Sequence, residues 1–248
     1  LKYLKRIKSE IKTKSSPDSK IDDFIKMMEK YKIEENIPFQ LINGVEGDLR
    51  NVNFVNLKQL IQYSFKVAGT VGYMFCKIIG VKDKNQIFRG VQLGIAMQLT
   101  NIARDVEEDL VRKRIYIPKS MRSYKKADYE FILKSKNIKK MFSMDLKSFL
   151  DKGDDIYQNS WEGIYKLPLR YRLPIGIAAE LYQQIGNKIK KKNYNVWNQR
   201  VYLSKVEKFF FALKVFRRII FVKKVNVNYD VDNKIKNALK PLDFISYE

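Results

Sequence analysis

Apolar residues recur every three or four positions along most of the 248-residue chain, and this spacing places them on one face of an α-helix. Polar and charged residues fill the positions between them, as on helices that bury one side. Extended chain is indicated only for the short run Arg114–Pro118. The pattern predicts helices over residues 1–13, from 21 onward, 57–79, 85–109, 129–133, 138–167, 175–189 and 201–222. It therefore favours an all-α fold.

The same pattern indicates one domain, because no stretch inside it has the composition of a linker. Asp18 or Ser19 is suited to cap the second helix, and a short apolar segment, 39–45, follows Pro38. The chain turns polar near its end, where valine and asparagine alternate. We therefore expect a domain over residues 1–222 and a polar C-terminal tail of uncertain order over residues 223–248.

Composition narrows the chemistry that this domain can perform. The chain has 11 glycines and 6 prolines, which is few for an all-β protein, and its longest apolar stretch, 209–222, is interrupted by three cations. A single cysteine, Cys76, rules out an internal disulfide, so we expect a cytoplasmic protein. The absence of histidine excludes Ser-His and Cys-His catalysis and histidine-bound metals. Any catalysis must use carboxylates, hydroxyls, amides and cations.

The formal net charge of +22 predicts attraction to an anionic partner, such as nucleic acid, an anionic membrane or a diphosphate. The charges are mostly lysines spread along the whole chain, without the concentrated arginine and aromatic block of a nucleic-acid groove. We therefore do not expect nucleic-acid binding. A solvated surface is the ordinary explanation for such lysines.

The strongest chemical pattern is a ladder of oxygen-bearing side chains in the predicted helix 85–109. Asp105 and Asp109 are one helical turn apart, and Asn101 and Gln98 continue the stripe backwards into an otherwise apolar stretch. Such hard oxygen ligands suit Mg²⁺, which binds through one or two carboxylates together with substrate phosphates. The alternative is that both aspartates are ordinary solvated acids in a charged run.

Two glycines, Gly69 and Gly72, interrupt an apparent helix, where each costs on the order of 1 kcal/mol relative to alanine. Something must therefore approach this helix face closely. Tight packing of a neighbouring helix and a channel wall for an apolar substrate are equally good explanations.

These residues resemble a known family, the phytoene and squalene synthases, which join two isoprenyl diphosphates head to head. Residues 91–118 are similar to the family's second aspartate-rich motif and the segment after it, through Gln98-Leu-Thr-Asn101-Ile-Ala-Arg-Asp105-Val-Glu-Glu-Asp109 and Arg114-Ile-Tyr-Ile-Pro118. Further matches extend the resemblance to roughly residues 20–215 and favour phytoene synthases. They are Val67-Ala-Gly-Thr-Val-Gly72 with the preceding Tyr63, Glu46-Gly-Asp48-Leu49, Tyr182, and Arg200-Val201.

The resemblance implies an isoprenoid synthase helical bundle with a central apolar cavity. It implies that Asp105, Asp109 and Asn101 hold Mg²⁺, or alternatively Mn²⁺. The implied catalytic residues are Asp105, Asp109, Tyr63 and Tyr182. The implied substrate-binding residues are Gln98, Asn101, Asp48, Arg104, Arg112, Arg114 and Arg200.

The implied reaction condenses two geranylgeranyl diphosphates to phytoene through prephytoene diphosphate, in carotenoid biosynthesis, without NADPH. Two alternatives stay open. One is a squalene or other head-to-head synthase that uses farnesyl diphosphate, where NADPH is not excluded. The other is a non-catalytic homologue that binds prenyl diphosphates or membranes. We expect a monomer, and a lipid product would suit peripheral membrane contact through the helix at 209–222.

The sequence departs from the family in one respect. The family has an earlier D-x-x-x-D motif, and Asp22-Asp23 lacks its spacing. We therefore expect that an N-terminal part is missing and that the 248-residue chain is inactive by itself.

Overall fold

The computed structural model describes residues 1–50, 52–126, 128–221 and 225–242. Within these ranges the chain is helical, and pairing between extended segments is limited to one bridge between Asn53 and Ile115. The all-α prediction is confirmed. The helices are α1 (Lys2–Thr13), α2 (Ser19–Tyr31), α3 (Asn36–Gly47), α4 (Leu57–Ser64), α5 (Thr70–Ile78), α6 (Lys84–Arg104), α7 (Val106–Val111), α8 (Tyr129–Lys134), α9 (Lys136–Lys166), α10 (Leu169–Lys191), α11 (Lys205–Ile220) and α12 (Tyr229–Leu239).

Two predicted helices contain interruptions. The predicted helix 57–79 contains a π-helical turn, Phe65–Gly69, between α4 and α5. The predicted helix 85–109 breaks at Asp105, whose backbone angles of φ −102° and ψ 17° separate α6 from α7. The turn continues across the break, because the Asp109 N–H donates to the Asp105 carbonyl at 2.9 Å. The one-turn spacing of the two aspartates therefore survives.

Other helix boundaries also differ from the sequence pattern. The short apolar segment after Pro38 belongs to a full helix, α3, which tolerates the proline because it lies in the first turn. Helix α10 starts before Pro174 rather than after it. Helix α11 starts at Lys205 rather than at residue 201, since Ser204 caps it and Val201 and Leu203 are buried in the extended segment before it. Asp18 caps α2, as expected.

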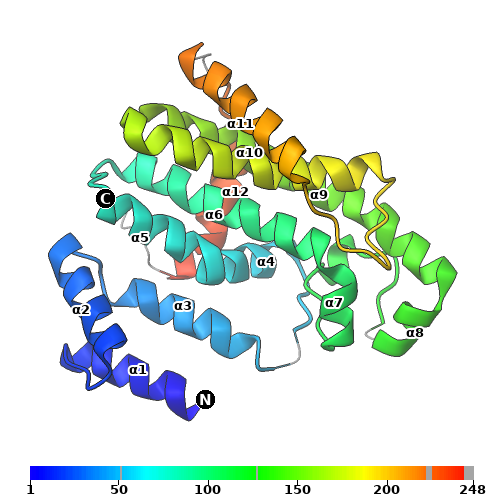
Figure 1. The fold of residues 1–248 in the computed structure, drawn as a ribbon. Coiled ribbons are helices and arrows are strands. Elements are labelled where there is room, and N and C mark those ends of the chain that lie inside the picture. The colour runs from blue at the N-terminus through cyan, green and yellow to red at the C-terminus, as the bar shows by residue number, and fades with distance from the viewer. Residues whose placement is uncertain (51, 127, 222–224, 243–248) are drawn as a thin grey trace.

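Helix α6 lies in the middle of the bundle, in contact with α5, α9 and α10 (Figure 1). Its contact with α5 is close because glycines face backbone. A Cβ at Gly72 would lie 2.2 Å from the Gly90 carbonyl oxygen, and one at Gly94 would lie 2.3 Å from that of Ala68. The glycines in the predicted helix 57–79 therefore allow tight helix packing.

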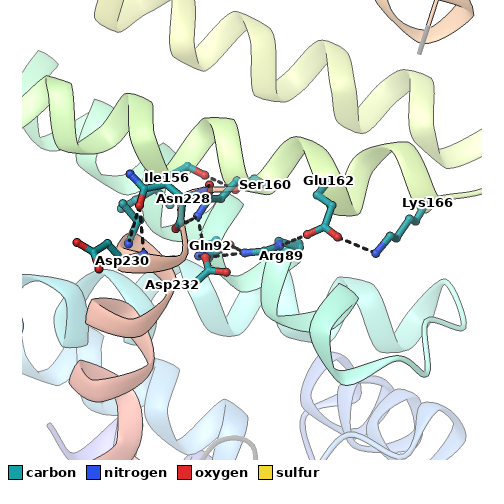
Figure 2. A network of polar contacts seen from close by, with 11 residues as sticks. Arg89, Gln92, Ile156, Ser160, Glu162, Lys166, Asn228, Asp230 and Asp232 are labelled. Carbon is teal, nitrogen blue, oxygen red and sulfur yellow. Dashed lines mark hydrogen bonds and ion pairs between the residues drawn. The ribbon is translucent and has the colours of Figure 1, made fainter. Parts of the chain in front are cut away.

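The C-terminal segment is held by a buried charge. Asp232 on α12 accepts hydrogen bonds from Arg89 and Gln92 of α6 and from Asn159 of α9, at 2.6, 2.7 and 2.7 Å. The Arg89 guanidinium also donates a hydrogen bond to the Glu162 carboxylate on α9, at 2.7 Å (Figure 2). These contacts join α12 to α6 and α9, and breaking a buried ion pair of this kind by removing one partner is strongly destabilising.

Residues 229–242 are thus not the polar appendage expected from the sequence. Helix α12 also buries Ile235, Ala238 and Leu239, and it packs on α4 and α9. The polar composition did not reveal this packing, because the residue that anchors α12, Asp232, is itself polar. Residues 222–224 and 243–248 of the expected domain end and tail lie outside the described residues.

Candidate active site

A largely apolar cavity of about 440 Å³ lies between α5, α6, α9 and α10. Helix α6 lines it with a stripe that recurs every three or four residues from Gln86 to Asn101. These fifteen steps correspond to a length of about 22 Å at 1.5 Å per residue. The opposite walls are apolar or small, and Gly72 is among them. They include Val67, Ala68, Val71, Gly72, Phe75, Ile79, Gly163, Ile164, Leu167, Ile175 and Ala178. The expected central apolar cavity is present, and Gly72 serves both helix packing and the channel wall.

Polar side chains gather at the α6 C-terminal end of this cavity. Gln98 and Asn101 from α6 and Tyr182 from α10 all line it. The Asn101 amide nitrogen donates to the Gln98 side-chain oxygen at 3.4 Å, while the Asn101 amide oxygen is buried without a hydrogen-bond partner among the described residues. A buried acceptor without a partner is costly, so this oxygen is suited to a donor or cation that enters the cavity.

Asp105 follows one turn later, held between two arginines. Arg104 contacts its two carboxylate oxygens at 2.8 and 2.7 Å, and Arg200 contacts them at 2.8 and 3.1 Å. Burial alone would raise the pKa of Asp105, but the hydrogen bonds from Arg104 and Arg200 outweigh it and hold the pKa below its usual value. Asp105 is therefore an ionised carboxylate.

Arg200 reaches Asp105 from the segment between α10 and α11. The backbone N–H of Asn198 donates to the Glu107 carboxylate on α7 at 2.7 Å, which ties this segment to the helix carrying the second aspartate. The Arg200 side chain is still more than half exposed. It is thus a cation at the rim of the site, free on one side to meet an anion from solvent.

Asp109 differs from Asp105, because burial and nearby charges, and no hydrogen bond from a described residue, act on its carboxyl group. Burial and the charge of Asp105 raise its pKa to about 7, against the opposing influence of Arg114 and Arg112. A half-buried carboxylate with a shifted pKa and no partner is a common sign of a functional position. An incoming cation would relieve both the burial and the repulsion.

Asp48 and Tyr63 belong to a second polar cluster beyond Asp109. The hydroxyls of Tyr63 and Tyr116 donate to the two Asp48 oxygens at 3.1 and 2.9 Å, and their rings stack with centroids 5.0 Å apart. Burial raises the pKa of both tyrosines, that of Tyr116 to about 12. Neither Asp48 nor Tyr63 lines the apolar cavity. The negative charge of Asp109 contributes to the raised pKa of Tyr116. Tyr116 was not among the expected site residues. In the sequence, its position in the extended run 114–118 was the one feature that could have indicated a role for Tyr116.

The arginines after α7 separate into two roles. Arg112 pairs with Glu108 at 2.7 Å on an exposed surface, so its guanidinium is engaged outside the cavity. Arg114 donates its backbone N–H to the Asp109 carbonyl at 2.8 Å, and its charge lowers the pKa of that carboxyl. Of the two, Arg114 is the better placed to act at the acidic end.

The donor set fits Mg²⁺. Among the described residues, Asn101 supplies an amide oxygen without a hydrogen-bond partner, and Asp109 supplies a carboxylate to which no hydrogen bond is made. Asp105 supplies an ionised carboxylate one turn from each. Mg²⁺ needs few protein ligands because it keeps waters and binds substrate phosphates. In the described part of the chain no group of three or more acids and cysteines that could hold a metal ion by itself is present.

The largely apolar cavity of this all-α bundle reaches Asn101, and one helical turn further Asp105 is held by two arginines. This arrangement is suited to an apolar chain with an anionic head. The profile of the squalene/phytoene synthase family matches residues 5–207, and the chain belongs to this family.

Individual relatives agree with this assignment. The chain is 32% identical over 162 residues to a 15-cis-phytoene synthase of Pantoea ananas, covering 65% of this chain and 52% of the relative. It is 32% identical over 170 residues to one of Enterobacter agglomerans, covering 68% and 57%. The chain thus spans little more than half the length of these curated relatives.

A solved dehydrosqualene synthase in complex with ligand has the same fold. Its TM-score is 0.77 at 22% identity, with 88% of this chain and 78% of that one covered. The isoprenoid synthase fold expected from the sequence is confirmed.

Proposed function

We propose that the complete protein is a prenyl transferase that condenses two geranylgeranyl diphosphates head to head into phytoene. The first step would release one diphosphate and one proton and form prephytoene diphosphate, which contains a cyclopropane ring. The second would release the other diphosphate and end with loss of a proton, so no reductant is needed. The carrying observation is the largely apolar cavity along α6, at whose end nearest Asp105 the side chains of Gln98, Asn101 and Tyr182 gather. The names of the relatives supply the substrate.

The residues at the acidic end would have two chemical roles, metal binding and phosphate binding. Asn101, Asp105 and Asp109 would hold Mg²⁺, which stabilises the negative charge of the departing diphosphate. Arg200 and Arg104 now neutralise Asp105. They are placed to hydrogen-bond phosphate oxygens as well, since a guanidinium has five N–H donors.

The rest of the cavity would protect the reacting carbon chain. An allylic cation survives only where water is excluded, and the walls from α5, α9 and α10 are apolar. Tyr182 and Gln98 present the polar atoms that line the cavity beside Asn101. Tyr63 and Asp48, with Tyr116, are proposed to act at the Asp109 side of the site rather than in the cavity.

A second candidate is condensation of farnesyl diphosphate. The dehydrosqualene synthase named above has a fold similar to this chain, and a cavity of this size does not distinguish two isoprenoid chain lengths. Squalene as product would need NADPH, whereas dehydrosqualene would not.

The test is product identification with the complete protein, Mg²⁺ and either diphosphate, in the presence and absence of NADPH. Asp105→Asn should lower turnover on the order of a hundredfold or more, since it removes a charge from the diphosphate end. Glu108→Gln is the matched control, because that acid lies in the same run but pairs outward with Arg112. Equal turnover of Asp105→Asn and the parent would remove Asp105 from the mechanism.

A further inference from the structure

Arg89 on α6 is an unexpected residue in the wall of a largely apolar cavity. Of the described residues that line the cavity between α5, α6, α9 and α10, it alone carries a charge. Arg89 precedes Asn101 by twelve residues, which corresponds to about 18 Å along the helix at 1.5 Å per residue. It therefore lies in the distal part of the cavity, far from the acidic end at Asp105.

Two acids hold the Arg89 guanidinium in place. Its Nη1 donates to the Asp232 carboxylate at 2.6 Å, and its Nε donates to the Glu162 carboxylate at 2.7 Å (Figure 2). Burial alone would lower the pKa of Arg89, but the hydrogen bonds to Asp232 and Glu162 outweigh it and hold the pKa above its usual value. The side chain is thus charged, and it cannot move without breaking a buried ion pair.

The base of the Arg89 side chain packs directly on α9. Gly163 lies opposite it and also lines the cavity. A Cβ at Gly163 would lie 2.4 Å from the Arg89 Cβ and 3.1 Å from its Cγ, so α6 and α9 leave no gap between them at this level. The bulk of Arg89 therefore limits the room in the distal part of the cavity.

We propose that Arg89 is a specificity-determining residue that limits the length of the isoprenoid chain that the cavity accepts. This inference rests on the proposed function, in which the diphosphate is bound near Asp105 and the carbon chain extends along α6. Because the head of the substrate is fixed at one end, each additional isoprene unit needs room in the distal part. Apolar pockets discriminate about 10- to 200-fold per methylene group. The satisfied network of Asp232 and Glu162 supplies the rigidity that such discrimination needs.

The test is a binding series with the complete protein, Mg²⁺ and three unreactive thiolodiphosphates, those of farnesol, geranylgeraniol and geranylfarnesol. Calorimetry gives the affinity for each chain length. Two double variants are compared, Arg89→Ala with Asp232→Asn and Arg89→Met with Asp232→Asn. Both remove the same two charges, so Asp232 is not left as a buried acid without its cation, and Glu162 keeps its contact with Lys166. The two variants differ only in the bulk of the side chain at position 89.

The parent should have a preferred chain length and bind the chain one isoprene unit longer more weakly. In the alanine variant, the affinity for that longer chain relative to the preferred one should rise at least about tenfold. The methionine variant should keep the preference of the parent, because it keeps an unbranched side chain of similar length. A purely structural role of Arg89 would instead change both variants alike, and at every chain length.

Circular dichroism and melting temperature establish that each variant is folded, and Arg89→Val with Asp232→Asn replaces the alanine variant if the latter is not. The inference is overturned if the folded small-residue variant keeps the preference of the parent, or if both variants lose affinity equally at every length. It is also overturned if the parent binds all three chains equally. Product formation by the parent separates these results from a failure of the proposed function, in which the parent neither binds nor converts any of the three chains.

Discussion

Replacing Asp232 with alanine tests whether α12 is an integral part of the fold. Its carboxylate oxygen accepts three hydrogen bonds from α6 and α9, and its side chain is 6% exposed (Figure 2). Alanine removes this acceptor and leaves the Arg89 guanidinium, itself 8% exposed, with Glu162 as its remaining acid. The variant therefore leaves an excess positive charge and an amide donor in a buried place.

Removing one partner of a buried ion pair costs about 3–5 kcal/mol. The Gln92 amide nitrogen also loses its one acceptor among the described residues, which adds about 1–3 kcal/mol if water does not enter. Glu162 offsets part of the first cost, so a total loss of about 3–5 kcal/mol is reasonable. For a chain of this size, this corresponds to a fall of about 6–20 °C in melting temperature.

The assay is thermal and urea unfolding followed by circular dichroism, together with hydrogen exchange of the α12 amides. Asp230→Ala is the matched control, since Asp230 lies one half-turn away on the same helix with its side chain 84% exposed. It should change the melting temperature by at most a few degrees. If Asp232→Ala melts within about 1 °C of the parent, the buried network does not hold α12 and the reasoning is refuted.

Three further predictions concern single positions. The pKa of Asp109 is about 7 in the fold against 3.8 unfolded, so its contribution to stability should decline as pH rises between these values; Asp109→Asn should remove this dependence in urea titrations at pH 5 and pH 8. Gly72→Ala should destabilise by about 1–3 kcal/mol or more, because its Cβ would meet a backbone oxygen at 2.2 Å. Gly47→Ala, where nothing lies within 4 Å, should be neutral or stabilising, and comparison of the two melting temperatures checks both. Burial raises the pKa of Cys76 to about 12, so a thiol reagent at pH 8 should label it slowly until denaturant is added; rapid labelling of the native chain would contradict this.

Much of the fold could be predicted because helical periodicity is local. The long helices α6 and α9 were found within a few residues, since their apolar positions repeat over many turns. The break at Asp105 was missed because side-chain contacts override local preference there, and the start of α10 at Leu169, five residues before Pro174, was missed because a proline ordinarily marks a helix start. The two arginines stabilise a break at Asp105 that the pattern of the helix does not reveal.

The candidate site likewise contains residues that could be predicted from the sequence and residues that could not. The ladder from Gln98 to Asp109 was visible because its residues are neighbours on one helix, and that spacing persists through the break. The grouping of Tyr63 with Tyr116 and Asp48 was not visible, because the three come from separate segments.

The sequence by itself determined the helical class, the ladder of oxygen ligands and the lack of histidine chemistry, since each follows from residue type and short-range spacing. Only the tertiary structure decided which of the described charged side chains are paired with one another and which are not. It neutralises Asp105 with Arg200 from 95 positions away, leaves Asp109 unpaired among the described residues, and buries Asp232 in the core. It also exposes Phe209 and Phe216 of α11 while burying Val215 and Ile219 of the same helix. These outcomes depend on which distant segments meet, and burial then sets the free energy of each charge.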